Sequence, residues 1–193
     1  MLHADIESVS GKLRDRNFNL ALQTLMPILY DTPDDLDALC LTGICLTETG
    51  RQEAAIRTLD YYLMLGGTGC DALEAMGCAC LRQGQPAEAR SYLLRALRQD
   101  PCCSSAYRNL GIALSQLGEH EDCLLALQQA ERRNPRDVLT LYALAPVLAH
   151  FGHNLEARSV LERILALDPP EDIRQFALAS LDKAEFRKNR EPS

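Results

Sequence analysis

Apolar and polar positions along this chain follow the period of an α-helix, and the helical stretches come in pairs. Residues 104–137 show the pattern most clearly. One helical face is marked by four residues at i, i+3, i+4 and i+7: Tyr107, Leu110, Gly111 and Leu114. A second stripe follows the break at Gly118: Cys123, Leu127 and Ala130. Pro135 then ends the segment, which therefore predicts a helix, a short turn and an antiparallel second helix.

The same landmarks return every 34 residues. Glycines recur inside the first helix of a pair and seven residues later, in the turn: Gly43 and Gly50, Gly77 and Gly84, Gly111 and Gly118, with a further turn glycine at Gly152. Small residues recur in the second helix: Ala21, Ala55, Ala89, Cys123 and Ala157. Prolines close the units, with Gly67 in the remaining slot: Pro33, Pro101, Pro135 and Pro169. Such a period is typical of stacked supersecondary units.

This pattern resembles the tetratricopeptide repeat, a helix pair of the same length with large and small residues at fixed places. In residues 104–137 the large residues are Tyr107, Leu110 and Leu114, and the small ones are Gly111, Cys123 and Ala130. Five units share one register: 2–35, 36–69, 70–103, 104–137 and 138–171. The resemblance implies an all-α fold, a right-handed superhelical solenoid of antiparallel helix pairs. We expect an amphipathic capping helix over 172–188 and a disordered tail over 189–193.

Departures from the pattern make individual helices unusual. The first helix of the chain keeps only a reduced apolar stripe of Ile6, Val9 and Leu13, so we expect a loose or capping helix. Pro27 and Pro146 lie inside predicted helices, where the missing N–H and the ring clash predict kinks. Pro86 lies in a first helical turn, where proline is tolerated.

Composition and charge limit the classes of function that the chain can have. With 47% apolar and 24% charged residues, the chain is predicted to fold as a soluble protein. Its start lacks the basic and apolar blocks of a signal peptide, and its apolar stretches are too short to span a membrane, so we expect a cytoplasmic protein. The net charge of −7 argues against nucleic acid or an anionic membrane as a partner.

The eight cysteines are predicted to stay reduced, because no signal segment directs the chain to an oxidising compartment. Cys80 and Cys123 occupy interhelix packing positions, where a free cysteine acts as a small apolar side chain. Cys102 and Cys103 follow Pro101 at a predicted helix start, where the helix dipole favours thiolate. These two are the most reactive thiols that the sequence predicts, and redox sensing through them is a hypothesis.

The sequence predicts no catalytic residues, no metal site and no cofactor. His150 and His153 flank the turn glycine Gly152, and we interpret both as solvated turn residues. The glycines at 66, 67 and 69 lack the lysine and hydroxyl residue that follow in a phosphate-binding loop. The protein is therefore predicted not to be an enzyme.

Recognition of another protein is the function that remains. In the tetratricopeptide repeat the first helices line a concave groove, and the resemblance places nine residues there: Cys40, Leu41, Ile44, Ala75, Cys78, Leu81, Asn109, Ile112 and Tyr142. Further lining positions are Ile6, Asp37, Asp71, Ser105 and Pro146. The strip is mainly apolar, which predicts a site for an amphipathic helix or an extended apolar segment, with Tyr142 and Asn109 supplying orientation and hydrogen bonds.

Three alternatives stay open. Ile44 and Ile112 could serve only the stacking of neighbouring first helices. The chain is also similar in size, acidity and apolar groove to the small tetratricopeptide chaperones of type III secretion. A self-assembling scaffold, in which an end helix of one copy fills the groove of another, would form homo-oligomers. The carboxylate clamp of tetratricopeptide co-chaperones matches only at Asn109, since the other places hold residues such as Cys40, Ile44, Ala75 and Ser105.

Overall fold

The computed structural model describes residue 9 and residues 11–188, with side chains described as far as residue 183. The described chain is helical and divides after Pro101 into two compact units, here called the first and the second unit. The first unit contains α2 (Phe18–Asp31), α3 (Leu36–Glu48), α4 (Gln52–Met64), α5 (Cys70–Arg82) and α6 (Pro86–Gln99). The second unit contains α7 (Ser104–Gln116), α8 (His120–Arg133), α9 (Val138–His150), α10 (Asn154–Ala166) and α11 (Glu171–Lys188).

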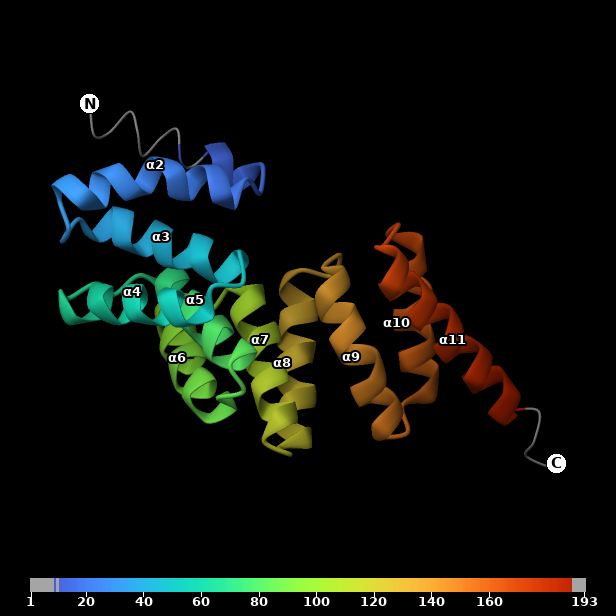
Figure 1. The fold of residues 1–193 in the computed structure, drawn as a ribbon. Coiled ribbons are helices and arrows are strands. Elements are labelled where there is room, and N and C mark those ends of the chain that lie inside the picture. Colours follow the sequence, from blue (N-terminus) through green and yellow to red (C-terminus); the bar gives the residue numbers. More distant parts are fainter. Residues whose placement is uncertain (1–8, 10, 189–193) are drawn as a thin grey trace. The chain divides into compact units, whose positions relative to one another are not determined.

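Within each unit the helices pack as antiparallel pairs, as the sequence predicts (Figure 1). In the first unit α3 packs against α2, α4 and α5, and α5 packs against α6. In the second unit α7 packs against α8, and α9 packs against α10 and α8. The predicted capping helix is α11, which packs against α10 and buries Ile173 and Ala177. The sequence predicts a reduced apolar stripe in the first helix of the chain. Ile6 of this stripe lies outside the described residues, whereas Val9 is fully buried and Leu13 packs on the core of the first unit.

In four helix pairs a glycine with positive φ closes the turn, with φ between 74° and 79°: Gly50, Gly84, Gly118 and Gly152. The turn after α3 shows why. The Gly50 N–H donates to the carbonyl of Thr47 at 3.2 Å, and the Arg51 N–H donates to that of Leu46 at 2.9 Å. This is the Schellman arrangement, which satisfies the last carbonyls of a helix and requires a left-handed residue.

The two helices of a pair touch where a leucine of the second lies on a glycine of the first. The contacts are Gly43 with Leu59, Gly77 with Leu93, and Gly111 with Leu127. A Cβ added to Gly111 would lie 2.6 Å from Leu127 Cγ, far inside van der Waals contact. These leucines are almost completely buried, so the absent side chain of the glycine is what lets the helices approach.

The α3–α4 pair differs from the next two pairs in the segment that follows its second helix. Tyr62 occupies the place at which the next two pairs have Ala96 and Ala130. A Cβ on Gly67 would lie 2.3 Å from the Tyr62 ring, and the Gly69 N–H donates to the Tyr62 hydroxyl at 2.8 Å. The large ring therefore explains why glycine replaces the closing proline in this unit.

The prolines have different consequences at different places. Pro86 is at the start of α6, as predicted. Pro27 and Pro146 lie inside α2 and α9, and both helices continue through them. Among the described residues, no helix combines the length and apolar character needed to cross a bilayer.

Two threonines of α3 are buried but differ in their hydrogen bonds. Thr47 Oγ1 donates to the carbonyl of Gly43 at 2.9 Å and lies 3.5 Å from that of Ala75 on α5. Thr42 is 3% exposed, and its Oγ1 has no hydrogen-bond partner among the described residues. A buried hydroxyl without a partner lowers stability, because its hydration is lost and not replaced.

Adding a side chain at Gly111 is expected to destabilise the second unit. Gly111→Ala should lower the free energy of unfolding by roughly 1–3 kcal/mol, and Gly111→Leu by more, because Leu127 must move. Chemical denaturation followed by circular dichroism measures both. Gly11→Ala is the control, since a Cβ on the helical Gly11 meets nothing within 4 Å. Unchanged stability of Gly111→Leu would contradict the helix contact described here.

Removing the unpartnered hydroxyl should stabilise the first unit. Thr42→Val is expected to raise the free energy of unfolding by about 1 kcal/mol, because it replaces a desolvated hydroxyl with a methyl of similar shape. The matched variant Thr47→Val should have the opposite effect, since it removes a satisfied hydroxyl. Thermal melts of the two proteins compare them directly, and a loss of stability in Thr42→Val would show that the hydroxyl has a partner.

Candidate functional site

Six of the predicted groove residues lie on two packed helices of the first unit: Cys40, Leu41 and Ile44 on α3, and Ala75, Cys78 and Leu81 on α5. Ala75 is only 4% exposed, and its carbonyl lies against the α3 hydroxyl of Thr47, so it mainly serves packing. The other five side chains are partly exposed. Residues three or four apart share a helix face, so we define the α3–α5 face as these five: Cys40, Leu41, Ile44, Cys78 and Leu81.

The three predicted groove residues of the second unit are in different environments. Asn109 on α7 is buried, at 6% exposure, whereas Ile112 one turn later is partly exposed. Tyr142 on α9 is 40% exposed and packs edge-on against the Phe176 ring of α11, with 4.7 Å between the ring centroids. Part of the Tyr142 ring therefore holds the capping helix, and the rest is available to solvent.

A pocket of about 420 Å³ opens between α7, α8 and α9 of the second unit. Its buried lining consists of Gly111, Cys123 and Leu127, the residues at which α7 and α8 meet. Ile112, Ala143 and Val147 add partly exposed apolar wall. The exposed lining is mostly polar: Ser115, Gln116, His120, Pro146 and His150. Apolar walls with a few polar groups are typical of binding sites, and the volume lies in the usual range.

His120 is a pocket residue that the sequence did not indicate. It begins α8, and its ring lies 5.0 Å from that of His150, the last residue of α9. His150 and His153 are exposed around the turn, as predicted. A signal for His120 was present only in its place, because it follows the turn glycine and so faces the end of the next first helix.

A largely buried ion pair joins α7 to the start of α9. Arg108 donates to Asp137 Oδ2 at 2.6 Å, and the Thr140 hydroxyl donates to the same oxygen at 2.6 Å. Both charged side chains are 17% exposed. Burial opposes the charge of Asp137, but the hydrogen bonds from Thr140 and Arg108 outweigh it and lower the pKa of the carboxyl. Asp137 also caps α9, so this neutralised pair supports the position of the helix that carries Tyr142.

The charges at the N-terminal end of the α3–α5 face are acidic. Asp37 and Asp71 occupy the first turns of α3 and α5, and both side chains are exposed. Burial, and then the charges of Asp71 and Asp37, raise the pKa of the Cys40 thiol to about 11. Cys40 is therefore a protonated, largely apolar side chain at neutral pH, close to two carboxylates.

The eight cysteines form no disulfide bonds, and Cys80 and Cys123 are buried, as predicted. Burial raises the pKa values of Cys80 and Cys123, which pack between helices. Cys102 is exposed, whereas Cys103 precedes the first residue of α7 and lies 3.3 Å from the Ser105 hydroxyl. Their redox activity stays a hypothesis.

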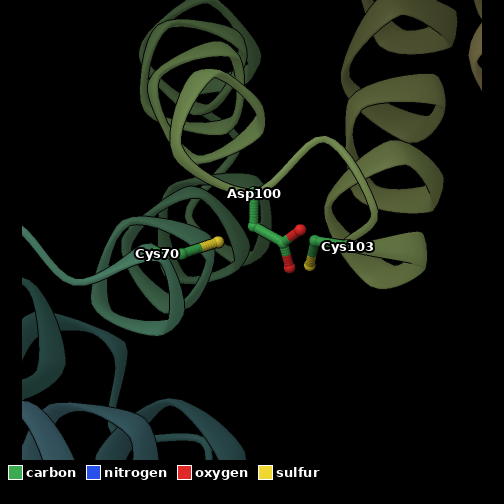
Figure 2. A group of neighbouring side chains, drawn as sticks. All are labelled: Cys70, Asp100 and Cys103. Carbon is green, nitrogen blue, oxygen red and sulfur yellow. The ribbon is translucent and has the colours of Figure 1, made fainter.

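In the first unit, the side chain of Cys70 at the start of α5 points toward Asp100, the residue that follows α6 (Figure 2). The Cys70 sulfur and a carboxylate oxygen of Asp100 lie within 4.8 Å. Among the described residues of either unit taken alone, no three ligand atoms of His, Cys, Asp or Glu side chains lie within 4.8 Å of one another. Two ligands do not complete the four-coordinate site that zinc prefers.

Comparison with known proteins finds similarity to tetratricopeptide-repeat proteins. A sequence model of the tetratricopeptide repeat matches residues 74–122, which run from α5 into α8. The chain is also 24% identical over 165 residues to the cellulose synthase 1 operon protein C of Komagataeibacter xylinus. That match covers 79% of this chain but only 12% of the relative.

Solved structures share the fold at low sequence identity. TTC0263 of Thermus thermophilus, a thermophilic TPR protein, aligns with a TM-score of 0.76 at 18% identity over 94% of this chain and 99% of that one. MamA of Desulfovibrio magneticus RS-1 gives 0.69 at 21% identity over 88% and 96%. YrrB, a TPR protein with an unusual peptide-binding site, gives 0.67 at 17% identity over 92% and 90%. At these identities the likeness shows the fold alone.

The electrostatic environment of Cys40 can be measured directly. Asp71→Asn is expected to lower the pKa of the Cys40 thiol from about 11 toward 9.0 without reaching it, because burial is the larger cause. The pH dependence of iodoacetamide labelling, resolved by tandem mass spectrometry, reports this pKa. Cys45 is the internal control, since burial and Glu48 raise its pKa to about 11. An unchanged profile at Cys40 would contradict the proximity of Asp71.

Proposed function

We propose that this chain, a tetratricopeptide-repeat protein, is a non-catalytic module that binds a peptide or helical segment of another protein. The observation that carries the proposal is the pocket of about 420 Å³ beside Ile112. Its buried floor and partly exposed apolar wall would take a large apolar side chain of the partner. The exposed polar residues around it would meet the partner's backbone or polar side chains.

The α3–α5 face of the first unit supports the same function. Four of its members, Leu41, Ile44, Cys78 and Leu81, offer partly exposed apolar surface on adjacent helices. Apolar surface of this kind suits an amphipathic helix laid along it, with anchors at i, i+3, i+4 and i+7. The remaining member, Cys40, is a thiol with a raised pKa and is poorly suited to nucleophilic chemistry.

The predicted site residues do not all contribute equally in this proposal. Ile44, Leu81 and Ile112 would make the principal contacts, because they are apolar and partly exposed. Ala75 and Asn109 would act by keeping the helices in place, since both are buried. Tyr142 would do both, through its contact with Phe176 and through its exposed part.

A charge at the pocket should weaken binding without unfolding the protein. Ile112→Glu is expected to weaken a captured partner by about 30-fold or more, roughly 2 kcal/mol, because the carboxylate would lose its hydration in the interface. The partner is identified by affinity capture from native lysate and mass spectrometry, and its affinity is then measured with purified protein. Leu125→Glu is the control, since Leu125 is 58% exposed on α8 and does not line the pocket.

Circular dichroism decides between the proposal and its main alternative. If Ile112→Glu loses helicity together with binding, Ile112 serves helix stacking and the proposal is wrong for this residue. Capture of further copies of the same chain would favour the self-assembling scaffold, and capture of a client that is insoluble alone would favour a secretion-type chaperone.

A further inference from the structure

Two carboxylates lie at one end of the α3–α5 face, and neither makes an ion pair with another described residue. Asp37 and Asp71 are exposed, and helical spacing places Asp37 on the side of α3 that carries Cys40 and Ile44, and Asp71 on the side of α5 that carries Cys78. Both charges also raise the pKa of the Cys40 thiol. Because Cys40 belongs to the face, the two negative charges border the same apolar surface from two adjacent helices.

Two other carboxylates beside first helices, Glu48 and Asp137, form ion pairs. At the opposite end of α3, Glu48 lies 3.7 Å from Arg16 and 4.0 Å from Arg82. In the second unit, Asp137 is paired with Arg108. Within the first unit, the apolar face therefore has a neutralised end and an uncompensated acidic end.

A single metal ion does not account for these carboxylates. The side-chain ligand atoms of Asp37, Asp71 and Cys40 do not all fall within 4.8 Å of one another in the described structure. Their positions in first turns, where negative charge stabilises a helix, explain part of their presence. That effect is shared by Glu53 and Glu88, which occupy the first turns of α4 and α6.

We propose that the α3–α5 face binds a cationic amphipathic segment of the partner, with Lys or Arg side chains beside Asp37 and Asp71 and apolar side chains on Leu41, Ile44, Cys78 and Leu81. This inference rests on the proposed function and adds the chemistry of the partner. The apolar contacts supply most of the affinity. The two carboxylates favour a positively charged partner and set its direction along the face. An acidic segment meets repulsion at the same place.

Two designed peptides test this selectivity. Both are 18-residue amphipathic helices of leucine and alanine, one with lysine and the other with glutamate on the polar face, each with a fluorescent label. Fluorescence anisotropy with the full-length protein at low and at physiological salt measures binding. We expect the lysine peptide to bind, the glutamate peptide to bind at least tenfold more weakly, and added salt to reduce the difference.

Matched charge-neutral variants assign the effect to the two carboxylates. Asp37→Asn/Asp71→Asn is expected to weaken the lysine peptide about five- to tenfold and to lower its salt dependence. Glu53→Gln/Glu88→Gln removes the same charge from the same helical turn of α4 and α6 and should leave binding unchanged. Because both double variants remove two negative charges from first helical turns, comparing them accounts for the effects of the helix dipole and of net charge.

The outcomes separate this inference from the proposed function. Equal binding of both peptides, lost in Ile44→Glu and in the milder Ile44→Ser, would overturn the charge selectivity and leave protein binding by the face intact. If the two double variants lost affinity for the lysine peptide equally, net charge would explain the effect, and the charge selectivity of the face would also be overturned. Binding of the lysine peptide that is unaffected by Ile44→Glu and Ile44→Ser would overturn both proposals for this face, and so would the absence of any peptide binding.

Discussion

The contact between a leucine and a glycine inside three of the helix pairs constrains the rest of the structure. Leu59, Leu93 and Leu127 occupy the space that a side chain would fill at Gly43, Gly77 and Gly111. This approach fixes the orientation of each first helix, because the glycine must face the second helix. The residues on the other side of the first helix are then left at the surface, and the apolar ones among them form the surface to which we assign binding.

Charge adds direction to that surface. In the second unit, Arg108 and Asp137 neutralise each other while they join α7 to α9. In the first unit, Glu48 is compensated by arginines, but Asp37 and Asp71 are not. The protein therefore combines an apolar strip, which favours many partners, with an acidic end that favours a few of them. Asp37 and Asp71 are two of the acidic residues that give the chain its net charge of −7.

Much of the fold could be predicted because its determinants are local. Turn glycines such as Gly50 require positive φ, and the 34-residue recurrence reveals the helix pairs. The burial of Cys80 and Cys123 follows from their places in the same pattern. The pocket depends instead on the separation of three helices, so the place of His120 after the turn glycine did not by itself identify it as a pocket residue. The contact of Tyr142 with Phe176 likewise depends on how α11 packs, which periodicity alone does not specify.

Site-specific photo-crosslinking tests the central claim most directly. A photoreactive amino acid in place of Ile112 would be compared, in native lysate, with the same residue in place of Leu155, which is 82% exposed on α10. We predict a discrete crosslinked polypeptide from position 112 and none from position 155. Crosslinking that is equal at both positions, or absent at position 112 in a folded protein, would contradict the assignment of this surface to partner binding.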